Sequence, residues 1–249
     1  MSPYLGKPVS DWKNITTGLV SSHPLTLQNI YDAVFRAWHS VWTTVIGGQN
    51  GYRLIDASPL PPAQVVGYLL EMLVAKEIEL INPCFTWGRG SEKDIHCTTN
   101  DSFSIEMKTS GQAKYEVYGN RSYGQTGTTA KKDKSGFYIT VNYFETTITL
   151  IRFGWIDSSD WTSQSASTGQ MASLSKDTYL HKLISIEGPY MLDAPVCMIK
   201  GVGKEALPSL QILNVKTIRD FLENPNLLVG IRGMKKAYDL AYAQYGHLL

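Results

Sequence analysis

The sequence predicts an α/β or α+β protein, with a core around a mixed sheet and a small all-α domain after it. Apolar residues at helical spacing dominate the first part of the chain, alternating and β-branched runs follow, and short apolar-periodic segments after glycine turns complete it. The 249 residues, 43% of them hydrophobic, suffice for one medium domain and a small one. The expected domains are 1–190 and 195–249, with their boundary between Gly188 and Pro195.

Two helices are expected before the strands. The first runs from about Thr26 to Ile46, and its apolar stripe is assigned to the core. The second runs from Pro62 to about Leu80. Its apolar stripe consists of Val66, Leu69, Leu70, Leu73 and Val74. Glu71 interrupts the border of this stripe. No basic residue lies three or four positions from it, so none on the same helix can pair with it. Such a carboxylate either faces solvent or is satisfied from elsewhere, by a lysine or a metal-bound water.

A β-hairpin is expected next, with strands at 94–98 and 103–110 joined by a turn of small polar residues. Apolar and polar residues alternate along the second strand, so Glu106 and Lys108 share one face. In a hairpin symmetric about its turn, Asp94 lies directly across from Glu106, with Cβ atoms about 5 Å apart. The spacing therefore brings two carboxylates and one ammonium group together.

This trio has the composition of a magnesium-dependent phosphodiesterase site. Mg²⁺ is usually held by one or two carboxylates together with substrate phosphate, and Asp94 and Glu106 supply two carboxylates. Lys108 can orient an attacking water and offset charge that develops on phosphate oxygens. A solvated strand face also carries Glu-x-Lys commonly, so the spacing alone leaves both interpretations open.

The joint pattern resembles the PD-(D/E)XK nuclease superfamily, with Asp94, Glu106 and Lys108 in its three signature positions. Lys93 stands where the family's name has proline. The resemblance implies a mixed sheet flanked by helices, catalysis by these three residues, and Mg²⁺ held by the two carboxylates. It also implies that a glutamate on the helix before the hairpin, here Glu71, completes the site as a further catalytic and metal-binding residue.

Positive charge is concentrated near the C-terminus. The whole chain carries +1, but residues 198–236 hold seven Lys or Arg against three Asp or Glu, a net charge of +4. Within this segment, 199–207 places a glycine turn at the head of a helix, where free amides and the helix dipole favour phosphate. The run to residue 222 resembles a helix-hairpin-helix DNA-binding module, with predicted contacts at Lys200, Gly201, Gly203 and Lys204. Residues 231–237 resemble a degenerate second copy. Packing or dimerisation is the alternative role of this domain.

Two further strands are expected at 136–144 and 147–155, and polar loops adjoin them. The string 119–125 is dense in side chains that can contact base edges, and a basic group follows on the same loop. The predicted DNA contacts there are Asn120, Arg121, Ser122, Tyr123, Gln125, Lys131, Lys132 and Lys134. The alternative is a structured or solvated loop. A second string lies at 152–157 and 160–164, after the second of these strands, and its Trp155, Asp157 and Trp161 are assigned to structure.

These strings and the charged constellation together resemble type II restriction endonucleases of the ScaI-type family, over about residues 10–185. The resemblance implies Mg²⁺-dependent cleavage of double-stranded DNA at a short palindromic site by a homodimer. A cognate DNA methyltransferase is expected in the same system but not as a bound partner. The helix-hairpin-helix-like tail is expected to hold the DNA backbone without reading sequence.

Two other functions remain open. XPF-like repair nucleases also join this nuclease fold to helix-hairpin-helix modules, but they carry Glu-Arg-Lys where this chain has Glu106-Met107-Lys108. A DNA-binding protein on an inactive nuclease fold is disfavoured because Asp94, Glu106 and Lys108 are all present.

Other features of the chain indicate a cytoplasmic protein. It lacks a signal peptide pattern and any apolar run of the roughly 20 residues that span a bilayer. Cys84, Cys97 and Cys197 are too few and too far apart for a disulfide framework or a cysteine zinc site.

Overall fold

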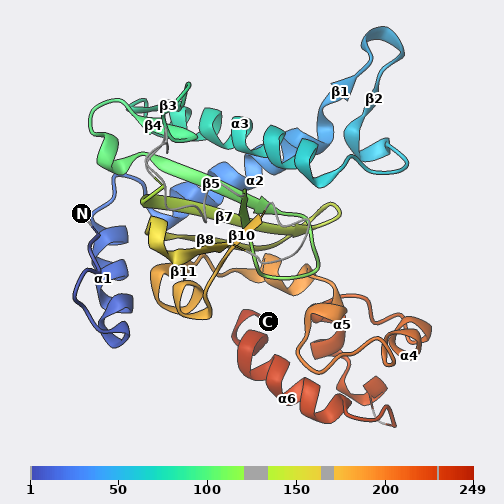
Figure 1. Cartoon of the computed structure of the whole chain (residues 1–249). Coiled ribbons are helices and arrows are strands. Elements are labelled where there is room, and N and C mark those ends of the chain that lie inside the picture. The colour runs from blue at the N-terminus through green and yellow to red at the C-terminus, as the bar shows by residue number, and fades with distance from the viewer. Residues whose placement is uncertain (1, 121–133, 164–170, 229) are drawn as a thin grey trace. The chain divides into compact units, whose positions relative to one another are not determined.

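The computed structural model describes residues 2–120, 134–163, 171–228 and 230–249, and it has a mixed α/β core with helices at its C-terminus (Figure 1). The chain forms two compact units. The first consists of Met1–Ser110, Glu116–Val141 and Ile151–Ile186, and the second of Gly111–Tyr115, Asn142–Leu150 and Glu187–Leu249. The second unit thus combines the C-terminal residues with two short segments from the middle of the chain.

Three helices precede the sheet: α1 (Val9–Ser21), α2 (Leu27–Thr43) and α3 (Ala63–Ile81). Thr26 caps α2 in a capping box with Asn29, at the predicted start. The helix ends three residues before the predicted Ile46, because residues 45–46 pair instead with residues 52–53 as the ribbon β1 (Val45–Ile46) and β2 (Tyr52–Arg53). No helix in the described part of the chain is long and apolar enough to cross a membrane.

A six-stranded sheet forms the centre of the fold, in the order β11-β8-β7-β5-β4-β3. Its strands are β3 (Phe85–Trp87), β4 (Ile95–Cys97), β5 (Ile105–Ser110), β7 (Gly136–Phe144), β8 (Thr147–Ile156) and β11 (Leu183–Ser185). The pairs β3–β4, β4–β5 and β8–β11 are antiparallel. β7 and β8 confirm the two predicted strands to within one residue, and both are buried almost throughout, as expected of strands covered on two faces.

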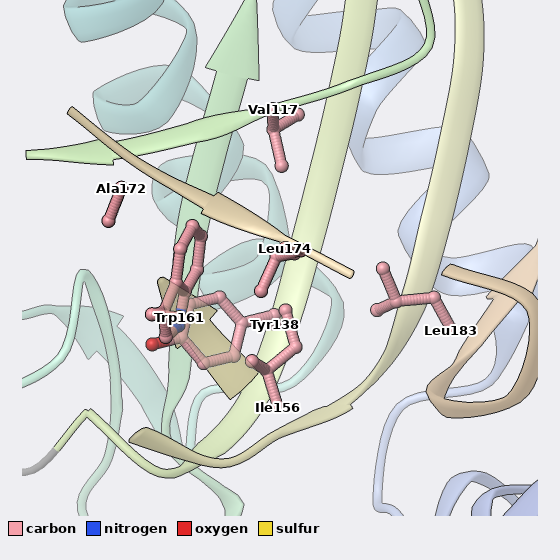
Figure 2. Close-up of a cluster of buried hydrophobic side chains, with 7 residues drawn as sticks. All are labelled: Val117, Tyr138, Ile156, Trp161, Ala172, Leu174 and Leu183. Carbon is pink, nitrogen blue, oxygen red and sulfur yellow. The ribbon is translucent and has the colours of Figure 1, made fainter. Parts of the chain in front are cut away.

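The two faces of β7 are covered by different parts of the first unit. Phe137 packs against His23, with ring centroids 4.5 Å apart, in an aromatic cluster that also includes Phe85, Phe103 and Phe153. Its neighbour Tyr138 points to the opposite face. There it joins a cluster beneath the small sheet of β6 (Tyr118–Asn120), β10 (Met171–Leu174) and β9 (Trp161–Ser163) (Figure 2).

A buried ionic cluster joins the start of the chain to later residues of the first unit. The Lys182 ammonium lies 2.9 Å from an Asp157 carboxylate oxygen and 2.8 Å from both carboxylate oxygens of Asp160. The rings of Tyr4 and Trp12 cover it at 4.2 and 4.3 Å. Asp157 also accepts a hydrogen bond from Trp155, and Trp161 is buried, in agreement with the structural roles predicted for these residues.

The described residues of the second unit include the helices α4 (Leu207–Ile212), α5 (Ile218–Glu223) and α6 (Met234–Tyr245), and a 3₁₀ segment at Pro225–Leu228. Their buried residues include Leu210, Ile218, Phe221, Ala237 and Ala241. Thr217 caps α5 in a capping box with Asp220. α5 and α6 pack against each other, with the ring centroids of Phe221 and Tyr238 6.2 Å apart.

We expect Lys182→Met to lower the free energy of unfolding by about 3–5 kcal/mol, because it leaves two buried carboxylates without their ammonium partner. The urea unfolding midpoint, followed by circular dichroism, measures the change. Lys76→Met is the matched control, since its side chain is 66% exposed in a surface ion pair and its loss should cost no more than about 0.5 kcal/mol. Equal midpoints for the two variants would contradict the structural role of the cluster.

Candidate active site

The hairpin of β4 and β5 has the predicted register. Ile95 pairs with Ile105, which is the pairing of a hairpin symmetric about Asn100. Continuing the register by one residue places Asp94 across from Glu106. The turn differs slightly from the prediction, because Asn100 accepts a hydrogen bond from the Ser102 amide and starts a 3₁₀ turn before β5.

The side chains of the predicted trio are in contact. The Lys108 ammonium donates to Glu106 Oε1 at 2.8 Å and to the Met107 carbonyl at 2.7 Å, and it lies 3.9 Å from Asp94 Oδ2. Asp94 Oδ2 also accepts a hydrogen bond from the Met107 amide at 2.8 Å. Side-chain exposure is only 6% for Glu106, 14% for Asp94 and 17% for Lys108. The trio is thus a shielded, preorganised group of charges and not a solvated strand face.

The charge of Lys108 follows from these contacts. Burial acts to lower the pKa of its ammonium group, but the carboxylates of Glu106 and Asp94 act in the opposite direction, and the pKa ends above its ordinary value. Lys108 is therefore protonated at neutral pH. It can stabilise negative charge and donate hydrogen bonds, whereas it cannot serve as a general base in this state.

The donor set suits a hard divalent cation. Asp94 and Glu106 present carboxylate oxygens from opposed strand positions, as Mg²⁺ sites that share their ion with substrate phosphate commonly do. Among the described residues, no three His, Cys, Asp or Glu side chains are gathered closely enough to hold a metal ion together. The two opposed carboxylates therefore fit a site that is completed by substrate and water.

Glu71 does not form a ready-made third ligand in this arrangement. It is half-buried on α3, one helical turn after Gly67, whose backbone packs so closely on β5 that a methyl group there would lie 2.5 Å from the Thr109 hydroxyl. Alternation along β5 points Thr109 to the face opposite Glu106 and Lys108. The role of Glu71 in catalysis and metal binding stays a prediction.

The predicted DNA-reading loop is described only at its two ends. Asn120 is exposed at the end of β6, where it pairs with Met171 of β10. Lys134 is half-buried immediately before β7, and burial lowers the pKa of its ammonium group. The other predicted contacts lie outside the described residues: Arg121, Ser122, Tyr123, Gln125, Lys131 and Lys132.

In the second unit, each of the two predicted glycine turns contains a glycine with a positive φ angle. Gly201 has φ of 99° and Gly233 has φ of 81°, both in the left-handed region that favours glycine. A buried apolar residue follows each of them, Val202 in the first turn and Met234 in the second. Gly201 also packs against Ala237, where a methyl group would lie 3.3 Å from the alanine Cβ.

Both turns line one open cavity of about 820 Å³ within the second unit. Gly201, Gly203 and Lys204 come from the first turn, and Arg232 comes from the second. Lys200, also predicted to contact DNA, is exposed next to Gly201. Arg232 was not among the predicted DNA contacts, although in the second turn it holds the position that Lys200 holds in the first.

Comparison with known proteins identifies the family. Residues 2–187 match the family model of the ScaI restriction endonuclease. The type II restriction enzyme ScaI of Streptomyces caespitosus is 37% identical over 185 residues, which cover 70% of this chain and 79% of that enzyme. No solved structure matches the chain. The chain therefore belongs to the ScaI restriction endonuclease family and is a type II restriction endonuclease, a site-specific enzyme that acts on DNA.

Proposed function

We propose that Asp94, Glu106 and Lys108 form the catalytic centre of this endonuclease, in a PD-(D/E)XK fold, and that it hydrolyses double-stranded DNA with Mg²⁺. The observation that carries the proposal is the Lys108 ammonium, 2.8 Å from Glu106 and 3.9 Å from Asp94 in a shielded group at the predicted register. A mixed sheet with a helix before the hairpin supports the assignment of the fold.

The roles follow from the charge and position of each residue. Asp94 and Glu106 would hold Mg²⁺, which supplies Lewis acidity and a more acidic water when bound. Lys108, protonated and fixed by Glu106 and the Met107 carbonyl, is placed to orient the attacking water and to stabilise charge on the phosphate oxygens. Glu71 is proposed to assist from α3 with an additional carboxylate. Family membership favours this function over the structure-specific repair nuclease and the inactive fold.

DNA contacts are proposed in both units. Asn120 and Lys134 border the segment proposed to read base edges, and the remaining predicted contacts lie between residues 121 and 132 of the sequence. Lys200, Lys204 and the two glycine turns of the second unit are proposed to hold backbone phosphates. A homodimer would present one catalytic centre to each strand of a palindromic site, and a cognate methyltransferase would protect host DNA.

We expect Glu106→Gln and Lys108→Met each to reduce the cleavage rate by about 10²–10³-fold or more, because the first removes a carboxylate proposed to hold Mg²⁺ and the second removes the positive charge proposed to stabilise the phosphate oxygens. Plasmid cleavage with Mg²⁺, with and without a chelator, measures the rates and the metal requirement. Glu79→Gln is the control, since this glutamate belongs to a surface ion pair on α3. Metal-dependent cleavage at the wild-type rate by Glu106→Gln would show that the centre lies elsewhere.

The variant Glu71→Gln tests whether Glu71 completes the catalytic site or is a partly exposed residue without a role in cleavage. If Glu71 completes the site, the cleavage rate should fall by about 10–100-fold, the range typical of groups that support a metal site. The rates are compared at several Mg²⁺ concentrations, again with Glu79→Gln as the control. Wild-type rates at every concentration would remove Glu71 from the site and leave the other three assignments intact.

The double variant Lys204→Ala, Arg232→Ala tests the cavity of the second unit. Each lost phosphate contact should reduce the slope of log affinity against log salt by about 0.9, so the double variant should lose about two units of slope on any duplex sequence. Fluorescence anisotropy with labelled DNA in metal-free buffer provides the affinities. Lys216→Ala, an exposed lysine of the same unit that does not line the cavity, should keep the wild-type slope. An unchanged slope in the double variant would exclude the cavity from DNA binding.

A further inference from the structure

Lys93, the residue before Asp94, makes a long-range contact with the start of β7. Its ammonium donates to the Ser135 carbonyl at 2.7 Å, across 42 positions of sequence. Gly136, the next residue, leaves the space that this ammonium fills, because a methyl group there would overlap Lys93 Nζ. The side chain of Lys93 is thus inserted beside a glycine that accommodates it.

Further hydrogen bonds hold residues 134–136, at the start of β7. The Tyr138 hydroxyl donates to the Lys134 carbonyl at 2.6 Å, so two successive carbonyls, those of Lys134 and Ser135, accept bonds from two different side chains. The Ser158 amide donates to the Ser135 hydroxyl at 3.0 Å. Tyr138 is fully buried and lies close enough to Lys108 to act on its ammonium electrostatically. Residues 134–136 are therefore held against the elements that carry the proposed catalytic centre.

The backbone around Lys93 is equally constrained. The Gly88 amide donates to the Asp94 carbonyl at 3.1 Å, and a methyl group on Gly88 would overlap the Lys93 carbonyl. The Asp94 carboxylate is in turn bonded to the Met107 amide. A shift of the peptide between Lys93 and Asp94 must consequently move the carboxylate that faces Glu106.

We infer that Lys93 is a positioning residue of this endonuclease, which fixes Asp94 by joining its peptide to residues 134–136 at the start of β7. The inference rests on the catalytic role proposed for Asp94. A proline at this position would stiffen the backbone by restricting its own φ angle. Lys93 achieves a comparable restraint through its side chain, and it also couples Asp94 to Lys134, a predicted DNA contact.

The test compares the full-length wild-type protein with Lys93→Met, which keeps the aliphatic length and removes the donor, and with Lys76→Met as a surface control. In metal-free protein, hydrogen exchange of amides 134–138 should become faster in Lys93→Met only. Mn²⁺ binding, measured by electron paramagnetic resonance, should weaken by about 10–100-fold, and the Mg²⁺ concentration for half-maximal cleavage should rise in proportion. DNA affinity without metal should stay within about twofold, because no predicted contact is removed.

A second variant distinguishes a specific loss of the Lys93 contact from a general loss of folding. Gly136→Ala closes the space beside Lys93, so it should weaken Mn²⁺ binding in the wild-type background and add little to the loss in Lys93→Met, as expected for coupled residues. Alanine at φ of 148° is strained in both backgrounds, so Mn²⁺ affinity and not stability is compared. Additive losses, or wild-type exchange and Mn²⁺ affinity in Lys93→Met, would overturn the inference. If the Glu106→Gln variant cleaves DNA at the wild-type rate, the proposed catalytic centre is wrong and not the role of Lys93 alone.

Discussion

Pairing of Ile95 with Ile105 across the β4–β5 hairpin brings Asp94, Glu106 and Lys108 to face one another. A strand that slips by one residue turns all its side chains to the other face, so this single register holds Asp94, Glu106 and Lys108 together. The apolar residues between them are buried on the opposite face, with Ile95 and Ile105 fully inaccessible. Hydrophobic burial thereby enforces the close approach of two carboxylates, and Lys108 offsets their mutual repulsion.

The hairpin was predictable because its signals are local. Alternation and turn chemistry within residues 94–110 sufficed to give the register and the contacts of the trio. The position of Glu71 could not be predicted in the same way. An apolar stripe indicates which face of a helix is buried, but it does not indicate where the helix lies on the sheet. The partner of Lys93 lies 42 residues away, and sequence pattern carries no signal for such a contact. The β1–β2 ribbon was missed because β1 directly follows α2 and continues its helical spacing.

Positive charge has different surroundings in the two units. In the first unit, Lys182 is buried and Lys108 is partly buried beside carboxylates, and each balances negative charge that the fold encloses. In the second, Lys204 and Arg232 line an open cavity bordered by glycine turns, where they remain accessible to an anion. The small net charge of the chain therefore conceals two separate populations of cations. Counting charges along the sequence detects the second population only.

The discontinuous make-up of the second unit has a consequence for biosynthesis. Residues 111–115 and 142–150 leave the ribosome well before the C-terminal residues with which they pack, such as Tyr245, whose hydroxyl lies 2.8 Å from that of Tyr115. Because synthesis proceeds from the N-terminus, this packing cannot be completed on a nascent chain that still lacks its last helix. This packing is therefore completed only after α6 has left the ribosome, and a chain that stalls before α6 cannot form it.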